Sequence, residues 1–150
     1  MSTVFFRPLC PADESEFYVM AEEFYHSPAV LHPIPPERHR AAFQEMMTSD
    51  RYLSGYLFAH GEKAAGFAVT NRMMQHELGG VVVWVEELYL RPDYRSQGLG
   101  SRFMTWLEQE LKGKAAEIRL ETEPENERAR ALYQRLGYEP LGYLQMVKTL

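Results

Sequence analysis

The amino-acid sequence predicts an α+β domain with a mixed sheet, and three observations support this prediction. The chain has 150 residues, of which 45% are hydrophobic, enough for one real core and too few for two ordinary domains. Three consecutive runs in its middle have the period-two pattern of strands. After them, strand-like and helix-like segments alternate, which favours a parallel strand pair. We expect a single domain over residues 1–150, with six to seven strands and about four helices.

The first fifty residues predict one strand and two helices. Thr3 to Arg7 is short and aromatic, stops at a proline, and is predicted to be the first strand. Pro11 to Tyr25 carries apolar residues at helical spacing, and a second helix should run from Pro36 to about Ser49. The segment between them, His26 to Glu37, contains four prolines and is not regular. It is either a wall of a substrate pocket or a plain linker.

The rest of the chain predicts an antiparallel meander followed by alternating helices and strands. The meander consists of Tyr52 to His60, Lys63 to Met74 and Val81 to Leu90, joined by glycine-containing turns. The later elements are a helix (Ser101 to Lys112), a strand (Ala116 to Glu121), a helix (Pro124 to Leu136) and two short strands (Tyr138 to Leu141, Tyr143 to Lys148).

Composition excludes several classes of function. A net charge of −5 argues against nucleic acid as a general partner, because phosphate neutralisation needs basic residues. Cys10 is the only cysteine, so no intrachain disulfide can form, as is typical of a reducing compartment. No apolar run has membrane-spanning length, and no signal peptide is recognisable. The five histidines lack metal-ligand spacing. We expect a cytoplasmic protein without metal, nucleic-acid or membrane partners.

The segment Tyr94 to Ser101 (YRSQGLGS) lies where an apolar strand meets an amphipathic helix. Gly98 and Gly100 leave the first helical N–H groups uncovered by side chains, and Arg95 and Arg102 flank them. A Walker A loop is excluded because no Lys-Ser/Thr pair follows the last glycine, and a dinucleotide fingerprint lacks its third glycine. The turn is therefore predicted to bind a phosphate or pyrophosphate, and a ligand-free turn is the alternative.

Two motifs resemble those of the GNAT superfamily of N-acyltransferases. Arg95, Gly98 and Gly100 form R-x-x-G-x-G, which resembles the acyl-CoA pyrophosphate loop of that family. The segment Glu125 to Tyr138 (ENERARALYQRLGY) resembles the family's N-x-x-A-x-x-L-Y-x-x-x-G-F/Y segment. With the element order, the resemblance spans nearly the whole chain, most weakly over the first fifty residues. It implies a GNAT-like acyl-CoA N-acyltransferase fold.

The resemblance also implies how acetyl-CoA is held as a cosubstrate. Main-chain groups of Leu88, Tyr89 and Leu90 should pair with the pantetheine arm, and an N–H near Leu88 or Tyr89 should polarise the thioester carbonyl. Asn126 should contact the cofactor arm. The pyrophosphate should lie on the backbone N–H groups of Gln97, Gly98, Leu99, Gly100 and Ser101, beside Arg95.

Two adjacent acids, Glu86 and Glu87, lie late in an otherwise apolar strand, an unfavourable place unless they line a cavity or pair with a cation. An alkylamine has a pKa of roughly 10, so exposing its lone pair at pH 7 costs about 4 kcal/mol and requires a proton acceptor. Adjacent strand residues face opposite sides unless a bulge re-aims them. The stretch VEELYLRPDYRSQGLG is similar to the polyamine acetyltransferase branch, in which the first of two acids is the base. We therefore favour Glu86, and an ordinary salt bridge is the alternative for each acid.

Tyr133 matches the position that, by the same resemblance, donates a proton to the departing thiolate. It shares a helix face with Leu132 and Leu136, so packing in the core is the alternative role for its ring. A phenol can fulfil both roles when its hydroxyl reaches the edge of a cavity.

The function that these features predict is direct transfer of an acetyl group from acetyl-CoA to a primary amine of a small cationic molecule. One alternative is a protein or peptide N-acetyltransferase, and another is a non-catalytic acyl-CoA-binding regulatory module. A homodimer through exposed C-terminal strands is left open.

Overall fold

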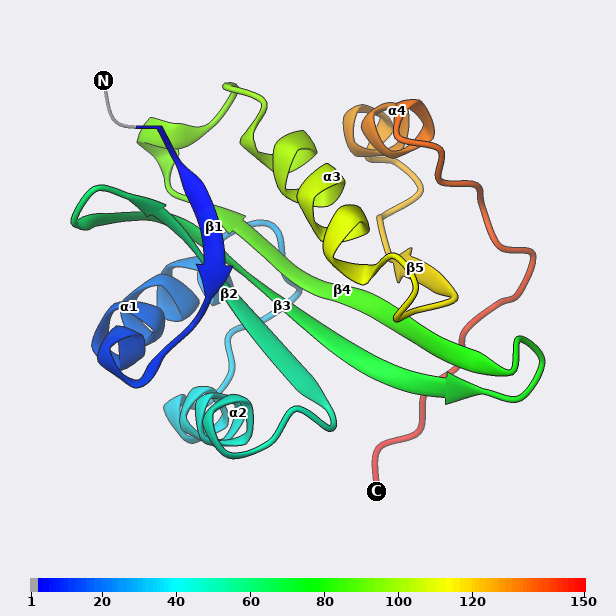
Figure 1. Cartoon of the computed structure of the whole chain (residues 1–150), viewed down its shortest axis with the longest axis horizontal. Coiled ribbons are helices and arrows are strands. Elements are labelled where there is room, and N and C mark those ends of the chain that lie inside the picture. Colours follow the sequence, from blue (N-terminus) through cyan, green and yellow to red (C-terminus); the bar gives the residue numbers. More distant parts are fainter. Residues whose placement is uncertain (1–2) are drawn as a thin grey trace.

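The computed structural model describes residues 3–150, which form one mixed sheet with helices on both faces (Figure 1). The strands are β1 (Phe5–Pro8), β2 (Leu53–His60), β3 (Lys63–Gln75), β4 (Gly80–Leu90) and β5 (Glu117–Leu120). The helices are α1 (Glu14–Tyr25), α2 (Pro36–Thr48), α3 (Leu99–Leu111) and α4 (Glu127–Arg135), with 3₁₀ turns at Pro11–Asp13 and Pro92–Tyr94. The predicted α+β class is confirmed, and every element predicted before Gly137 is present.

The strands lie in the sheet in their order along the chain. The first three pairings are antiparallel, and β4 and β5 are parallel, with Val82 opposite Glu117 and Val85 opposite Leu120. Because β5 ends there, the last residues of β4, up to Leu90, are paired with β3 alone among the described strands. One edge of β4 is therefore open just before the glycine turn.

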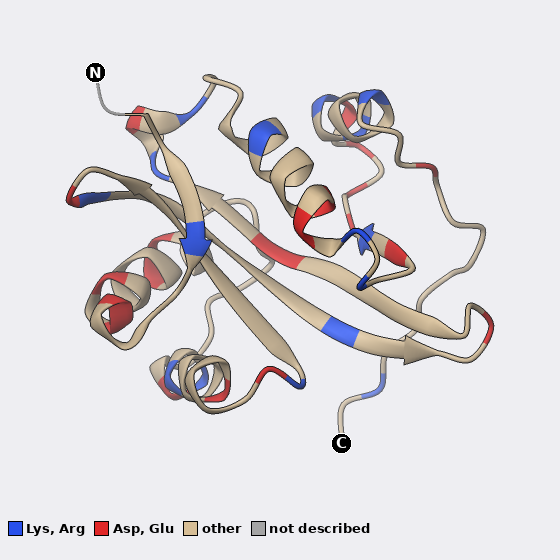
Figure 2. Cartoon of the chain, viewed as in Figure 1, with Lys and Arg blue, Asp and Glu red and all other residues tan. Residues whose placement is uncertain are grey.

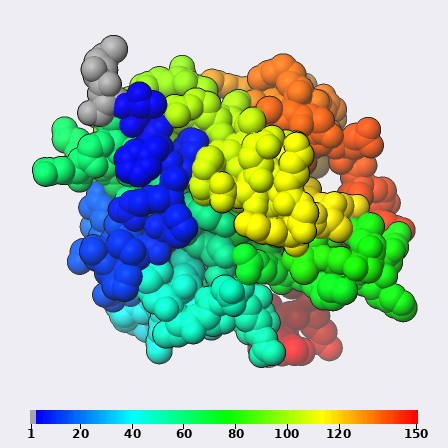
Figure 3. Space-filling model, viewed as in Figure 1, coloured from blue at the N-terminus to red at the C-terminus, as the bar shows by residue number. Residues whose placement is uncertain are grey.

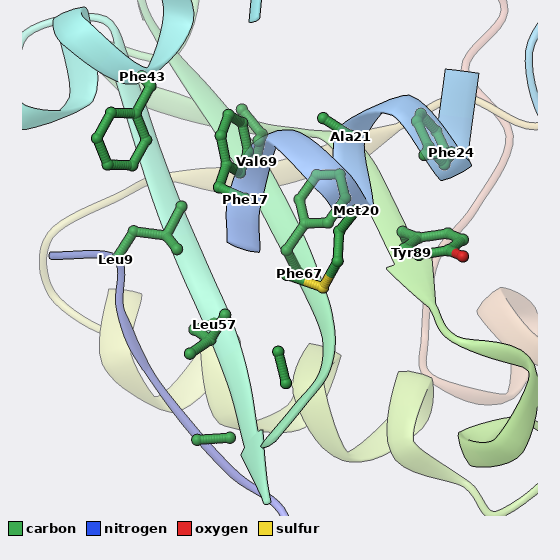
Figure 4. Packing of buried hydrophobic residues seen from close by; sticks show 12 residues of the cluster. Leu9, Phe17, Met20, Ala21, Phe24, Phe43, Leu57, Phe67, Val69 and Tyr89 are labelled. Atoms are coloured by element: carbon green, nitrogen blue, oxygen red, sulfur yellow. The ribbon is translucent and has the colours of Figure 1, made fainter. Parts of the chain in front are cut away.

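The helices α1 and α2 cover one face of the sheet through a core of aliphatic and aromatic side chains (Figure 4). Phe67 of β3 is fully buried there, and its ring centroid lies 5.4 Å from that of Phe17 and 6.1 Å from that of Phe24. Phe17, Met20 and Phe24 recur at helical spacing along α1, and Figure 4 shows them directed toward the sheet. This packing holds the end of α1 against the end of β4.

On the other face, α3 packs through Phe103, Met104 and Leu107, all almost fully buried. The ring of Phe103 lies 4.9 Å from that of Phe58 on β2. The helix α4 adds half-buried side chains, including Tyr133, to the same core. Thus the glycine turn at the start of α3 is anchored to the centre of the sheet. Within residues 3–150, no helix is both long and apolar enough to cross a membrane.

The two predicted C-terminal strands, Tyr138 to Leu141 and Tyr143 to Lys148, are wrong, so the sheet has five strands rather than six or seven. Leu144, Met146 and Val147 are 88–94% exposed. Apolar composition supplies strand propensity, but a strand forms only by backbone pairing with a neighbouring edge. The segment lies beside the end of β5 through a side-chain hydrogen bond from Gln145 to Glu121 at 2.6 Å, but it is not part of the sheet. In Figure 3 its last residues (dark red) emerge at the lower edge of the molecule, away from α4 (orange).

Candidate active site

The glycine turn joins the end of β4 to the start of α3. Gly98 has a φ of +75° and directly precedes the first helical residue, Leu99. The N–H groups of Leu99, Gly100 and Ser101 are the first of the helix and have no intrahelical partner. A Cβ added to Gly98 would meet no atom within 4 Å, so the space beside the turn is open. Glycine at 98 is required by the backbone conformation, and the exposed N–H groups can bind an anion.

The polar side chains of the turn are partly used within the protein. The Arg95 Nε donates to the Leu90 carbonyl at 2.8 Å, and the Gln97 amide donates to the Asp93 carbonyl at 2.9 Å. Arg102 instead donates to the Val4 carbonyl at 2.8 Å, so its charge is directed toward β1. Of the two arginines predicted to flank the turn, Arg95 is the one beside the end of β4.

The end of β4 offers a main chain with one free edge. Leu88, Tyr89 and Leu90 pair with β3 on one side and have no strand on the other among the described residues. An extended ligand can add to such an edge through backbone hydrogen bonds. On the β3 side, Gly66 lies so close that a Cβ there would be 2.1 Å from the Tyr89 carbonyl oxygen. Glycine at 66 is therefore needed for this close approach.

A cavity of about 240 Å³ lies against this part of β4. Its walls are Leu88 to Leu90 and Arg95 on one side, and Phe24 with Ser27 to Ala29 on the other. The proline-rich connection after α1 therefore does line a pocket. A larger hollow of about 570 Å³ is lined by Arg7, Asp13, Glu16, Arg91 and residues of the β2–β3 turn. Arg7 is paired with Asp13 and Arg91 with Glu16, so the smaller cavity is the better candidate for the acyl group.

The acidic pair lies at a β-bulge in β4. Val69 is opposite Glu87 and Thr70 is opposite Val85, which leaves Glu86 as the extra residue. Figure 2 shows this acidic segment (red) within the long strand β4. Val85 before the bulge and Leu88 after it both pack in the core on the α3 side, so the two residues between them face the other side of the sheet. Burial, together with the charges of both carboxylates, raises the pKa of Tyr25 on that side. Glu86 and Glu87 therefore lie on the α1 side of the sheet together, rather than on opposite faces.

The two acids differ in their surroundings. Glu86 is exposed and accepts a long hydrogen bond of 3.5 Å from the Asn71 amide. Glu87 is half-buried, and burial together with the charge of Glu86 raises its pKa to about 7, against a hydrogen bond from Tyr25 that lowers it. A carboxyl with a pKa near 7 can accept a proton at neutral pH more effectively than an ordinary one.

Tyr25 and His39 were not predicted as site residues. Tyr25 is the last residue of α1, and its ring centroid lies 5.4 Å from that of His39 on α2. His39 is 4% exposed, and its Nε2 lies 2.8 Å from a Glu22 carboxylate oxygen. The position of Tyr25 just before the proline-rich segment was the one available signal, but its contact with β4 is visible only in the fold.

The two predicted residues on the α4 side are placed differently. Tyr133 packs against the core on the α3 face, and burial raises its pKa. Its ring therefore has the packing role, which leaves the proposed proton-donor role of its hydroxyl open. Asn126 caps α4, since its side-chain oxygen accepts from the Ala129 N–H at 3.1 Å. Its amide nitrogen remains the part that can contact a cofactor. No group of three or more His, Cys, Asp or Glu side chains within residues 3–150 is arranged to hold a metal ion.

Comparison with known proteins gives a family match over most of the chain. Residues 15–138 match the sequence model described as "Acetyltransferase (GNAT) family". No curated protein sequence is similar enough to match.

The fold is similar to several solved structures of low sequence identity. A possible acetyltransferase from Clostridium difficile 630 has a TM-score of 0.86 at 13% identity, with 98% of this chain and 97% of that chain covered. The structure of AAC(6')-Iy in complex with the bisubstrate analogue CoA-S-monomethyl-acetylneamine has a TM-score of 0.80 at 19% identity, with 99% of each chain covered. Ribosomal-protein-alanine N-acetyltransferase from Brucella melitensis biovar Abortus 2308 has a TM-score of 0.77 at 16% identity, with 98% and 100% covered.

Proposed function

Because this chain belongs to the GNAT acetyltransferase family, we propose that it transfers an acetyl group from acetyl-CoA to a primary amine of a small cationic molecule. The observation that carries the proposal is the acidic pair at the β4 bulge, which directly precedes the open strand edge of Leu88 to Leu90 that leads to the glycine turn. A negatively charged site beside an acyl-binding edge suits an acceptor that arrives as an ammonium ion.

The chain's own groups fit the cosubstrate. The backbone N–H groups of Gln97 to Ser101 would hold the diphosphate, because the helix start is unpaired and the space beside Gly98 is open. The free edge of Leu88 to Leu90 would pair with the pantetheine arm, which leads toward the adjoining cavity. Asn126 would contact the arm through its amide nitrogen. Acetyl-CoA supplies the activated thioester that the amine attacks.

A carboxylate of the acidic pair would take the proton of the acceptor. Glu86 is the base that the family resemblance indicates, and it is accessible from solvent. Glu87 is the second candidate, with a pKa near 7 that suits a general base. Tyr133 would donate a proton to the departing thiolate. Since burial raises the pKa of that phenol, the transfer requires a positive charge or hydrogen-bond donor that stabilises the phenolate as it forms.

A protein or peptide acceptor is the second candidate function. It is favoured by the fold likeness to a ribosomal-protein-alanine N-acetyltransferase, whereas the acidic pair and the likeness to AAC(6')-Iy favour a small cationic acceptor. Both candidates use the same cosubstrate site, and they differ only in the acceptor side.

An acceptor screen tests the proposal directly. Purified protein with acetyl-CoA should release free thiol only when a suitable amine is added from a panel of polyamines, aminoglycosides, amino acids and short peptides. Glu86→Gln and Tyr133→Phe should each slow turnover at least tenfold if they have the roles above. Tight cofactor binding without turnover across the panel would instead indicate a non-catalytic acyl-CoA-binding module.

The cosubstrate site can be tested with Gly98, and Gly113 at the other end of α3 is its matched control. Gly98 and Gly113 both have positive φ, +75° and +78°, and neither has an atom within 4 Å of an added Cβ. Gly98→Leu and Gly113→Leu should therefore cost similar stability. In calorimetric titrations with CoA, the first should weaken binding at least tenfold and the second should not. Equal affinities in the two variants would remove the proposed diphosphate site.

We also propose that the protein is a cytoplasmic homodimer. The chain has exposed apolar residues after Tyr143, and no described strand covers the outer edge of β5. The segment from one copy could therefore pair with the β5 edge of another. Reciprocal pairing between two copies would cover both at once and close with two-fold symmetry. Light scattering on the full chain should give twice the monomer mass, and Leu144→Asp with Met146→Asp should reduce it to one. A monomeric wild-type protein would disprove the dimer.

A further inference from the structure

The end of α1 makes a direct contact with the acidic bulge. The hydroxyl of Tyr25 donates a hydrogen bond to the Glu87 carboxylate, although the two residues are far apart in the sequence. The contact forms because α1 is packed against β3 and β4. The ring of Phe24, next to Tyr25, lies 6.1 Å from that of Phe67 and 6.0 Å from that of Tyr89. Tyr25 is therefore held at the bulge by the core on which α1 rests.

The ring of Tyr25 is also fixed from its other sides. It contacts the ring of Phe24 edge-on at 5.2 Å and that of His39 at 5.4 Å. His39 is itself buried beside Glu22 of α1, with 2.8 Å between its Nε2 and a carboxylate oxygen. Thus two helices hold the phenol just before the segment that lines the cavity.

The bulge brings Glu86 and Glu87 together, and Tyr25 distinguishes between them. The bulge brings two negative charges to one side of the sheet, where they repel each other. Tyr25 gives a hydrogen bond to Glu87, whereas Glu86 is exposed and, within residues 3–150, receives the long hydrogen bond of Asn71. One carboxylate is consequently fixed in direction, and the other stays free to attract a cation.

We propose that Tyr25 is the positioning residue of the reaction: its hydroxyl orients the Glu87 carboxylate as proton acceptor, while Glu86 attracts the cationic acceptor. The inference rests on the proposed function. The acceptor enters as R–NH₃⁺ and gives one proton to Glu87. Its nitrogen then forms the N–C bond to the acetyl carbon as the C–S bond breaks. Tyr133 gives its hydroxyl proton to the departing thiolate and regains one from the second proton lost by the nitrogen, so the products are the amide, CoA–SH and one proton released from Glu87 to solvent.

The groups that act on Glu87 give opposite predictions for two substitutions. Glu86 on β4 raises its pKa and Tyr25 on α1 lowers it, and beyond Tyr25 lie His39 on α2 and Glu22 on α1. Tyr25→Phe should therefore raise the pKa of Glu87 further, and Glu86→Gln should lower it. The acid limb of the kcat/KM pH profile should move up by roughly one pH unit in the first variant and down in the second.

Tyr18→Phe is the matched control, because Tyr18 is on the same helix and its hydroxyl bonds the exposed Glu14 at 3.0 Å. Its pH profile should coincide with that of the wild type. A second readout without turnover is the titration of the Glu87 carboxyl carbon by NMR, assigned with Glu87→Gln. The carbon should titrate at higher pH in Tyr25→Phe and at lower pH in Glu86→Gln.

Each outcome decides between distinct hypotheses. If the Glu87 titration is the same in Tyr25→Phe and the wild type, Tyr25 has a packing role only and the inference fails. If Glu86→Gln abolishes turnover while Glu87→Gln does not, Glu86 is the base and the inference also fails. If the wild type acetylates no amine, the proposed function fails, and the NMR titration still reports whether Tyr25 acts on Glu87.

Discussion

Asp13 and Glu87 are two carboxylates withdrawn from solvent at opposite ends of α1, and their proton affinities have shifted in opposite directions. Asp13 precedes the first residue of the helix and accepts two hydrogen bonds from Arg7, at 2.8 and 2.9 Å, and one from the Cys10 N–H at 2.8 Å. These bonds, led by that of Arg7, lower its pKa to about 2 although burial opposes the change. Glu87, beyond the other end of the helix, has a pKa of about 7 because burial and Glu86 outweigh Tyr25.

The difference shows that partners, more than burial, decide whether a carboxyl in this protein has a lowered or a raised pKa. Asp13 is fully satisfied and joins β1 to the start of α1, so its charge contributes to folding. Glu87 has one hydrogen bond and a like charge beside it, an arrangement that costs stability and is typical of functional sites. Three substitutions test this contrast, from the largest expected effect to the smallest.

Glu87→Gln should have the largest effect on activity, lowering turnover roughly 100-fold or more while CoA affinity stays the same. The same substitution should stabilise the fold at high pH. A carboxyl whose folded pKa is raised contributes stability below its unfolded value of about 4.5, and this contribution is lost as pH rises through about 7. At pH 8 we expect the variant to be more stable than the wild type by roughly 2 kcal/mol in urea unfolding. A variant that is less stable at that pH would refute the view of Glu87 as a strained group.

Asp13→Asn should show the reverse pattern, with turnover retained and stability reduced. A carboxyl whose folded pKa is lowered contributes stability above its unfolded value of 3.8, and this contribution is lost as pH falls through about 2. The variant should lose roughly 2 kcal/mol at pH 7, because the Arg7 guanidinium loses its charged partner. The deficit should shrink toward pH 2 in the same urea experiment. A large loss of turnover in a folded variant would give Asp13 a role that the comparison denies it.

Glu16→Gln should have the smallest effect. Its carboxylate pairs with Arg91, but the Glu16 side chain is 45% exposed and Arg91 keeps a second partner in Glu23 at 3.4 Å. Exposed ion pairs contribute less than about 1 kcal/mol and are screened by salt. Urea unfolding at low and high salt should therefore differ little between the variant and the wild type, with turnover unchanged. If Glu16→Gln lost as much unfolding free energy as Asp13→Asn, the burial of an ion pair would not determine its contribution to stability.

Most of the fold could be predicted because its signals are local. The period-two runs predicted the meander, which is present. The glycine turn predicted where α3 begins, and the helix starts at Leu99, two residues before the predicted Ser101. The last strands failed because the residues from Tyr143 onward show strand composition but do not reveal whether an edge is within reach.

The sequence predicted the site residues that belong to local motifs, but not the contacts between residues that are distant in the chain. Glu86 and Glu87 stand out as acids in an apolar strand, and the glycines form the turn motif. The bulge, in contrast, depends on how β4 is paired with β3. No pattern in VEELYL specifies that two residues share one partner, so alternation predicted that only one acid faces the acceptor side. Tyr25 and His39 reach the site through the packing of two helices, which the sequence does not encode at short range.

Gly66 limits how the proposed acyl pocket can be remodelled. Since no side chain fits between β3 and the Tyr89 carbonyl, the strand that forms one wall of the pocket cannot retreat when larger groups are introduced on the opposite side. Acceptance of longer acyl chains must come from the wall formed by Ser27 to Ala29, which belongs to an irregular loop. Selection for a changed acyl donor should therefore accumulate substitutions in that loop and leave the sheet untouched.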